Sequence, residues 1–119
     1  MVDVLTHQAD HMLPVLRGDQ LAAPELLDYE FLSGVRAQLF RGEVSLTLAY
    51  AAIGDFDDLP IRRFTTTGAF RHRAFALRDN VTAYGAAYVV LAEALDVPLL
   101  TRDARLARST GHDARIELV

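Results

Sequence analysis

Three polar residues beside short apolar segments are of types that suit metal-assisted chemistry. Glu30 interrupts an apolar stretch, whereas Thr101 and Asp103 come at the end of the apolar run at residues 99–101. Carboxylates are the ligands that Mg²⁺ and Mn²⁺ prefer, and such a cation can activate water and neutralise a phosphate. Ligands of open α/β sheets bind beyond the carboxyl ends of the strands, so an acid directly after a strand is well placed to act.

Glu30 lies in a predicted helix at residues 24–41. This helix is apolar over most of its surface, so we expect it to be largely buried. Ser33, Gly34 and Ala37 are helical neighbours of Glu30, and such small residues leave room for an ion or a ligand beside the carboxylate. The alternative is a carboxylate that reaches solvent or pairs with an arginine.

Residues 82–103 predict a helix, a tight connection and a short buried strand. Pro98 ends the helix, because its ring disfavours helical geometry at the preceding residue. The apolar side of the helix is formed by residues at helical spacing, and we expect all of them to pack. They are Tyr84, Tyr88, Leu91 and Leu95, with Ala87, Val90 and Ala94 beside them.

The other segments alternate in a similar way. We expect helices at residues 4–16, 43–55, 68–78 and 104–108, and strands at 21–23, 60–64 (an edge strand) and 114–119. Alternating helices and short strands predict an α/β sandwich with a mostly parallel sheet. At 119 residues the chain fits a single domain.

Composition excludes several classes of function. With 12 basic and 16 acidic residues, the net charge of −4 argues against an overall electrostatic attraction to nucleic acid. The absence of cysteine excludes disulfides and thiolate metal sites. No apolar run approaches the roughly 20 residues of a membrane span, and no signal-peptide pattern is present. We therefore expect a soluble cytoplasmic protein that does not enter a membrane.

Three charged clusters have two interpretations each. His7 and His11, four residues apart, could chelate a metal or could be surface histidines. An acidic triplet could bind a cation or form a solvated loop; it consists of Asp55, Asp57 and Asp58. Residues 62–78 hold five arginines, which could contact an RNA backbone or form a charged helix face.

Several motifs in the chain resemble those of PIN-domain proteins, and most closely the VapC-type toxins of bacterial toxin–antitoxin pairs. The resemblance covers nearly all of the chain. The motifs that carry it are Pro24-x-Leu26-Leu27-x-x-Glu30, Thr82-x-Tyr84-x-Ala86-x-Tyr88 and Pro98-Leu99-Leu100-Thr101-x-Asp103.

This resemblance implies a PIN-like three-layer sandwich, with helices on both sides of the sheet, and an Mg²⁺-dependent endoribonuclease. Glu30 and Asp103 would be ligands of Mg²⁺ or Mn²⁺ and would act in catalysis, and Thr101 would support the site. The implied partners are an RNA substrate, a cognate antitoxin and a second copy of the chain.

Two acids of the family are missing. Gly85 stands where the third motif has an aspartate, and no apolar strand ends in Asp-Ala or Asp-Ser. Residues 2–5 look more like the first turns of the helix that follows such a strand. We therefore predict that the first central strand is missing, and that residues 1–119 form one PIN-like domain that begins late relative to the family.

Three functional hypotheses follow. The first is a VapC-type endoribonuclease with impaired activity. The second is a catalytically inactive PIN domain that still dimerises or binds an antitoxin through its apolar N-terminal helices. The third is a small α/β protein without a site.

Overall fold

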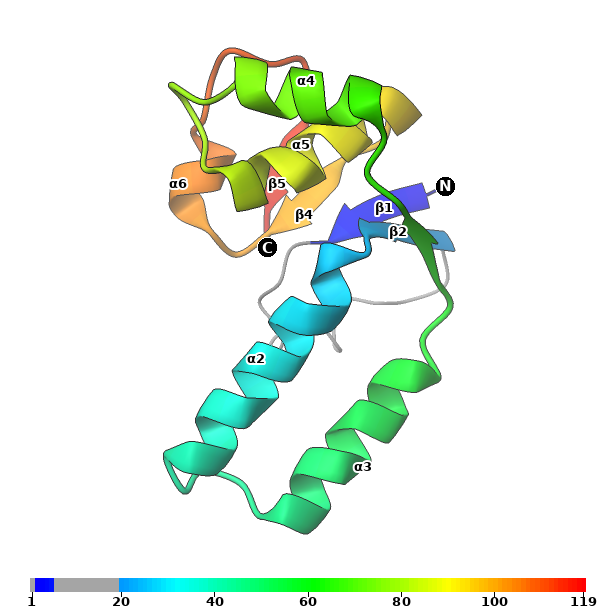
Figure 1. The fold of residues 1–119 in the computed structure, drawn as a ribbon, viewed down its shortest axis with the longest axis vertical. Coiled ribbons are helices and arrows are strands. Elements are labelled where there is room, and N and C mark those ends of the chain that lie inside the picture. Colours follow the sequence, from blue (N-terminus) through cyan, green and yellow to red (C-terminus); the bar gives the residue numbers. More distant parts are fainter. Residues whose placement is uncertain (1, 6–19) are drawn as a thin grey trace.

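The computed structural model describes residues 2–5 and 20–119, with side chains from residue 21 onward. Five parallel strands form one sheet in the order β3-β2-β1-β4-β5 (Figure 1). The strands are β1 (Val2–Leu5), β2 (Gln20–Pro24), β3 (Ile61–Phe64), β4 (Leu99–Thr101) and β5 (Ile116–Leu118). The parallel sheet and the edge position of β3 agree with the prediction.

The centre of the sheet is occupied, contrary to the prediction of a missing strand. Val2–Leu5, expected to be helical, forms β1 and pairs with β2 on one side and β4 on the other. Asp3 lies opposite Leu21 in this ladder. Without a strand here, facing backbone groups of β2 and β4 would lack partners, at about 1–3 kcal/mol for each buried group. The rest of the predicted helix at residues 4–16, with His7 and His11, lies outside the described residues.

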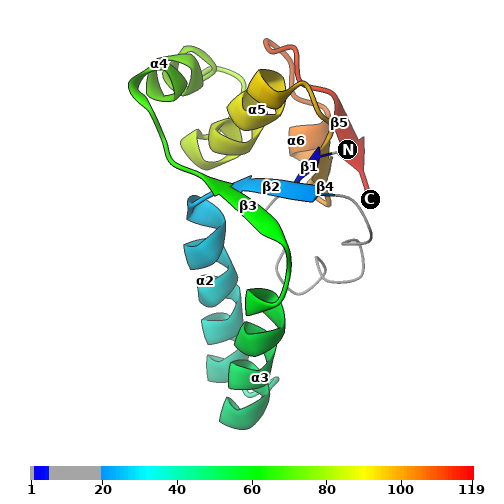
Figure 2. The same cartoon turned by 90° about the vertical axis from the view of Figure 1, so that its right-hand side faces the viewer.

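The helices cover both faces of the sheet. Figure 2 shows α2 and α3 on one side and α4 and α5 on the other, which gives the expected three layers. The helices are α2 (Leu26–Phe40), α3 (Leu46–Asp57), α4 (Gly68–Ala76), α5 (Ala83–Leu95) and α6 (Ala104–Ala107). In the described part of the chain, no helix has the length and apolar character to cross a membrane.

The helices α2 and α3 form an arm that extends from the sheet (Figure 1). The rings of Phe31 and Phe56 stack at 4.0 Å between centroids and join the two helices. Contrary to the prediction, α2 is not largely buried: Leu27, Phe31 and Val35 are its buried residues. It projects beyond the sheet (Figure 1), and among the described residues its outer face carries the exposed side chains of Tyr29, Leu32 and Phe40. The acidic triplet lies exposed at the end of α3.

Helix α5 packs on the opposite face, and its central residues form most of the second core. Residues 88–92 are all buried, together with Leu77, Leu99 and Leu106. Tyr84 departs from the prediction, because 64% of its surface is exposed. It lies in the first turn of α5, two residues after the N-cap residue Thr82.

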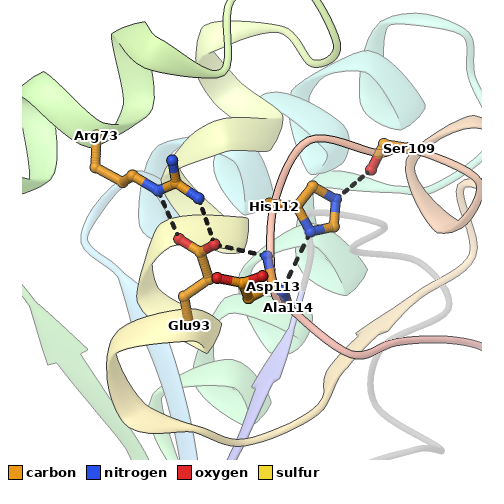
Figure 3. A network of polar contacts seen from close by, with 6 residues as sticks. All are labelled: Arg73, Glu93, Ser109, His112, Asp113 and Ala114. Carbon is orange, nitrogen blue, oxygen red and sulfur yellow. Dashed lines mark hydrogen bonds and ion pairs between the residues drawn. The ribbon is translucent and has the colours of Figure 1, made fainter.

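A polar network ties the loop before β5 to α4 and α5 (Figure 3). Arg73 donates two hydrogen bonds to Glu93, and the Asp113 amide donates a third. His112 Nδ1 accepts from the Ala114 amide, so its other nitrogen is the N–H that faces Ser109 Oγ. The imidazole thus cannot accept the Ser109 proton, and the pair is structural.

Replacing Glu93 by Gln should lower the free energy of unfolding by about 1–2 kcal/mol at neutral pH. The Arg73 guanidinium, which donates the strongest of its hydrogen bonds, holds the pKa of Glu93 below its ordinary value of 4.5. This stabilisation is therefore complete above pH 4.5 and is lost as the pH falls through the lowered pKa. Urea unfolding of both proteins across this range measures the difference.

Glu43→Gln is the matched control, because Glu43 also pairs with an arginine but is exposed. We expect little change in stability for that variant. Equal losses for the two variants would contradict the assigned role of Glu93.

Candidate functional site

The candidate residues gather at the carboxyl edge of the sheet. Because all five strands are parallel, Pro24 at the end of β2 and Thr101 at the end of β4 lie at the same edge. Glu30 is in the helix after β2, and Asp103 directly follows β4. β1 lies between these strands, where the chain order reverses, and such a switch point is where open α/β sheets bind ligands.

Glu30 is held by a side chain from the opposite layer. The Tyr88 hydroxyl on α5 donates a hydrogen bond to Glu30 Oε1 on α2. Tyr88 is fully buried, and burial, followed by the Glu30 carboxylate, raises its pKa well above the ordinary value of 10. The tyrosine therefore stays protonated at neutral pH and acts as a donor that fixes the orientation of the carboxylate.

Asp103 is positioned by Thr101 and caps the next helix. The buried Thr101 hydroxyl accepts a hydrogen bond of 2.9 Å from the Asp103 amide. Asp103 Oδ1 in turn accepts from the amides of Arg105 and Leu106, at 2.9 and 3.2 Å. Thr101 is thus a positioning residue, and the exposed carboxylate of Asp103 remains at the surface of the site.

Gly85 and Asp103 line the same pocket, which has a volume of about 350 Å³. Tyr88 lines it as well, so its hydroxyl links the pocket to Glu30. A Cβ at position 85 would lie 3.3 Å from Leu106 Cδ1 and 3.4 Å from Thr82 Oγ1. A side chain would therefore need a small shift of the Leu106 methyl group, which is flexible.

The described residues do not form a complete metal site. No three of their histidine, aspartate or glutamate side chains lie close enough together to hold a metal ion. Glu30 and Asp103 supply two carboxylates, and each already accepts hydrogen bonds. Since Mg²⁺ binds near-octahedrally through oxygen ligands, this pair alone would bind it weakly.

Several arginines of the basic segment at residues 62–78 contact other side chains of the protein. Arg63 pairs with Asp28 at 2.8 Å and Arg73 with Glu93 at 2.7 Å, so these two arginines have internal roles. Arg78 lines the pocket while its guanidinium lies 4.8 Å from the centre of the Phe75 ring.

Arg105 and Asn80 also line the pocket, although neither was predicted from the sequence as a site residue. Each lies within a few residues of a recognised motif, and that proximity was the available signal. The Tyr88–Glu30 hydrogen bond was also missed, because helical spacing had assigned Tyr88 to the apolar stripe.

Known structures share this architecture. A protein from Pyrobaculum aerophilum, PAE2754, matches with a TM-score of 0.71 and 19% identity over 98% of this chain and 92% of that one. VapBC2 from Rickettsia felis, bound to a DNA fragment from its promoter, matches with a TM-score of 0.67 and 11% identity, covering 99% and 98% of the two chains. At such low identity these matches show the fold alone, which is a PIN-like α/β fold.

Relatives found by sequence identify the family more narrowly than the structures do, although no family model matches. Ribonuclease VapC12 of Mycobacterium tuberculosis is 42% identical over 104 residues, which are 87% of this chain and 80% of the relative. Ribonuclease VapC1 of the same organism is 42% identical over 97 residues, 82% and 73% of the two chains. This chain belongs to the VapC ribonuclease family.

Replacing Tyr88 by Phe should lower the free energy of unfolding by about 1–3 kcal/mol, because a buried hydrogen bond to a carboxylate is lost. Since the pKa of Tyr88 is raised, its stabilisation is complete below pH 10 and is lost as the pH rises through the raised value. Denaturant titrations at pH 7 measure the effect.

Tyr84→Phe is the control, since Tyr84 is exposed and its hydroxyl has no hydrogen-bond partner among the described residues. It should leave stability unchanged. If both variants behaved alike, the Tyr88–Glu30 contact would not be a stabilising one.

Proposed function

We propose that this chain is a VapC-type toxin with weak Mg²⁺-dependent endoribonuclease activity and a cognate antitoxin as its partner. Family membership supports the ribonuclease chemistry. We propose weak activity because of Gly85. This residue lines the pocket at the position where the motif resemblance predicts a third carboxylate. Residues 1–119 would act as a single domain.

In this proposal the residues that remain act on substrate and metal from fixed positions. Glu30, oriented by Tyr88, and Asp103, positioned by Thr101, would be the ligands for Mg²⁺ or Mn²⁺. The ion would supply water activation and charge neutralisation when bound. Two carboxylates hold it too weakly for efficient catalysis, so RNA would bind more readily than it is cleaved.

Gly85→Asp should strengthen Mg²⁺ binding and raise cleavage of single-stranded RNA above that of the unmodified protein. The new carboxylate would enter the pocket that Asp103 lines, and a negative charge in the first turn of α5 is also favoured by the helix dipole. Mg²⁺ at ten times its Kd would add about 1.4 kcal/mol to the free energy of unfolding. Thermal unfolding with and without Mg²⁺ and an RNA cleavage assay measure the two effects.

Gly85→Asn is the control, because it has nearly the same shape and no charge. It should gain neither Mg²⁺ binding nor cleavage, and adding Glu30→Gln to Gly85→Asp should abolish the gain. If Gly85→Asp behaved like Gly85→Asn, the placement of the third motif at Gly85 would be wrong.

A second candidate is an inactive domain that binds partners, and the exposed face of α2 favours it. Tyr29, Leu32 and Phe40 recur at helical spacing on this face, and 73%, 42% and 68% of their respective surfaces are exposed. Apolar side chains gathered on one exposed helix face are typical of interaction sites. We propose that this face packs against a second copy of the chain or against the antitoxin.

Leu32→Glu should convert a dimer of the purified chain to a monomer without loss of fold, because it places a charge in the exposed apolar face. Analytical ultracentrifugation and circular dichroism measure association and fold. Thr47→Glu, at an exposed position on α3, should leave the dimer intact. An unmodified protein that is already monomeric would exclude the homodimer and leave the antitoxin as the occupant.

A further inference from the structure

The pocket beside Gly85 contains an aromatic and a basic side chain that form no hydrogen bond or ion pair within the described residues. Its lining comes from the segment before α5, the first turns of α5, and the start of α6. Tyr84 contributes to this lining and is 64% exposed. Within the described residues its side chain takes part in no hydrogen bond, ring contact or cation–π contact. An aromatic ring so placed is available to a planar ligand.

Arg105 contributes a cation to the same pocket from α6. Its guanidinium has no ion-pair or hydrogen-bond partner in the part of the chain that the structure describes. Arg63, Arg73 and Arg115, in contrast, are each bound to a carboxylate within 3.0 Å. A guanidinium that is not neutralised by an internal acid is suited to bind a phosphate.

The glycine keeps this part of the pocket open. A Cβ at position 85 would already lie 3.3 Å from Leu106 Cδ1, so a larger side chain would occupy space that the pocket now has. The opening of about 350 Å³ thus combines an exposed ring, a cation and free volume. Asp79 and Asp103 also line the pocket and balance the charges of Arg78 and Arg105. Affinity for a ligand would therefore depend on stacking and not on charge alone.

We propose that this pocket is a nucleotide-binding subsite, in which Tyr84 stacks on one base of single-stranded RNA and Arg105 contacts an adjacent phosphate. Proteins that bind single strands use this combination of aromatic stacking and basic side chains. The inference rests on the proposed function, because RNA is taken as the ligand. It requires no metal and no cleavage, and can therefore be tested separately.

The test is fluorescence anisotropy of a labelled, short oligoribonucleotide of mixed sequence, titrated with the full chain in EDTA so that no cleavage occurs. Tyr84→Ala should raise the Kd by about 5- to 150-fold, the range that stacking of one base accounts for. Tyr84→Phe keeps the ring and should retain binding within about twofold. Arg105→Gln should raise the Kd and reduce its dependence on salt.

Two control variants use the same residue types elsewhere. Tyr50→Ala removes an equally exposed tyrosine from α3, and Arg115→Gln removes an arginine that pairs with Asp96. Neither should change the Kd. The proposal is overturned if Tyr84→Ala binds like the unmodified protein, if Tyr50→Ala weakens binding equally, or if the unmodified protein does not bind the oligonucleotide.

The outcomes separate this inference from the proposed function. RNA binding that depends on Tyr84, without cleavage by the unmodified protein or by Gly85→Asp, would support the subsite and contradict the ribonuclease. Cleavage with Mg²⁺ by a protein whose RNA binding is indifferent to Tyr84 would support the ribonuclease and overturn the subsite.

Discussion

The hydrogen bond from Tyr88 to Glu30 is the contact on which the geometry of the site depends. It joins α5 and α2, which cover opposite faces of the sheet, at the edge where the strands end. A buried tyrosine hydroxyl needs a partner, and a carboxylate in a partly apolar layer needs a donor, so each group secures the other. This contact fixes the position of Glu30 relative to the pocket, although α2 and α5 are distant in sequence.

The sheet positions the two helices that make this contact, and it also determines how much of α2 is packed. With β1 at the centre, the ladder is continuous from β3 to β5, and each face carries its own core. Only part of α2 lies over the sheet. The remainder extends into the arm with α3, which leaves an apolar face available to a partner while Glu30 stays beside the pocket edge. Catalytic and partner-binding roles would therefore use different faces of the same helix.

Gly85 has no carboxylate, but the contacts that surround it are those of an intact fold. The neighbouring interactions are kept: Thr82 caps α5, Thr101 positions Asp103, and Asp103 caps α6. These contacts stabilise the fold whether or not a metal binds, and none of them needs a carboxylate at position 85. The same glycine leaves space between α5 and Leu106, and this space is what a nucleotide would use. A change that weakens cleavage need not weaken RNA binding.

From residue 20 onward, the sequence alone determined the succession of helices and strands, because apolar spacing, capping residues and Pro98 act locally. It also placed Glu30, Thr101 and Asp103 near the ends of parallel strands, because a parallel α/β order brings those ends together. Only the tertiary structure decided that Val2–Leu5 is a strand, since four residues suit either form until β2 and β4 offer ladder partners. It alone decided that Tyr84 is exposed while Tyr88 is buried, because helical periodicity identifies a face but cannot tell where its packing partner ends.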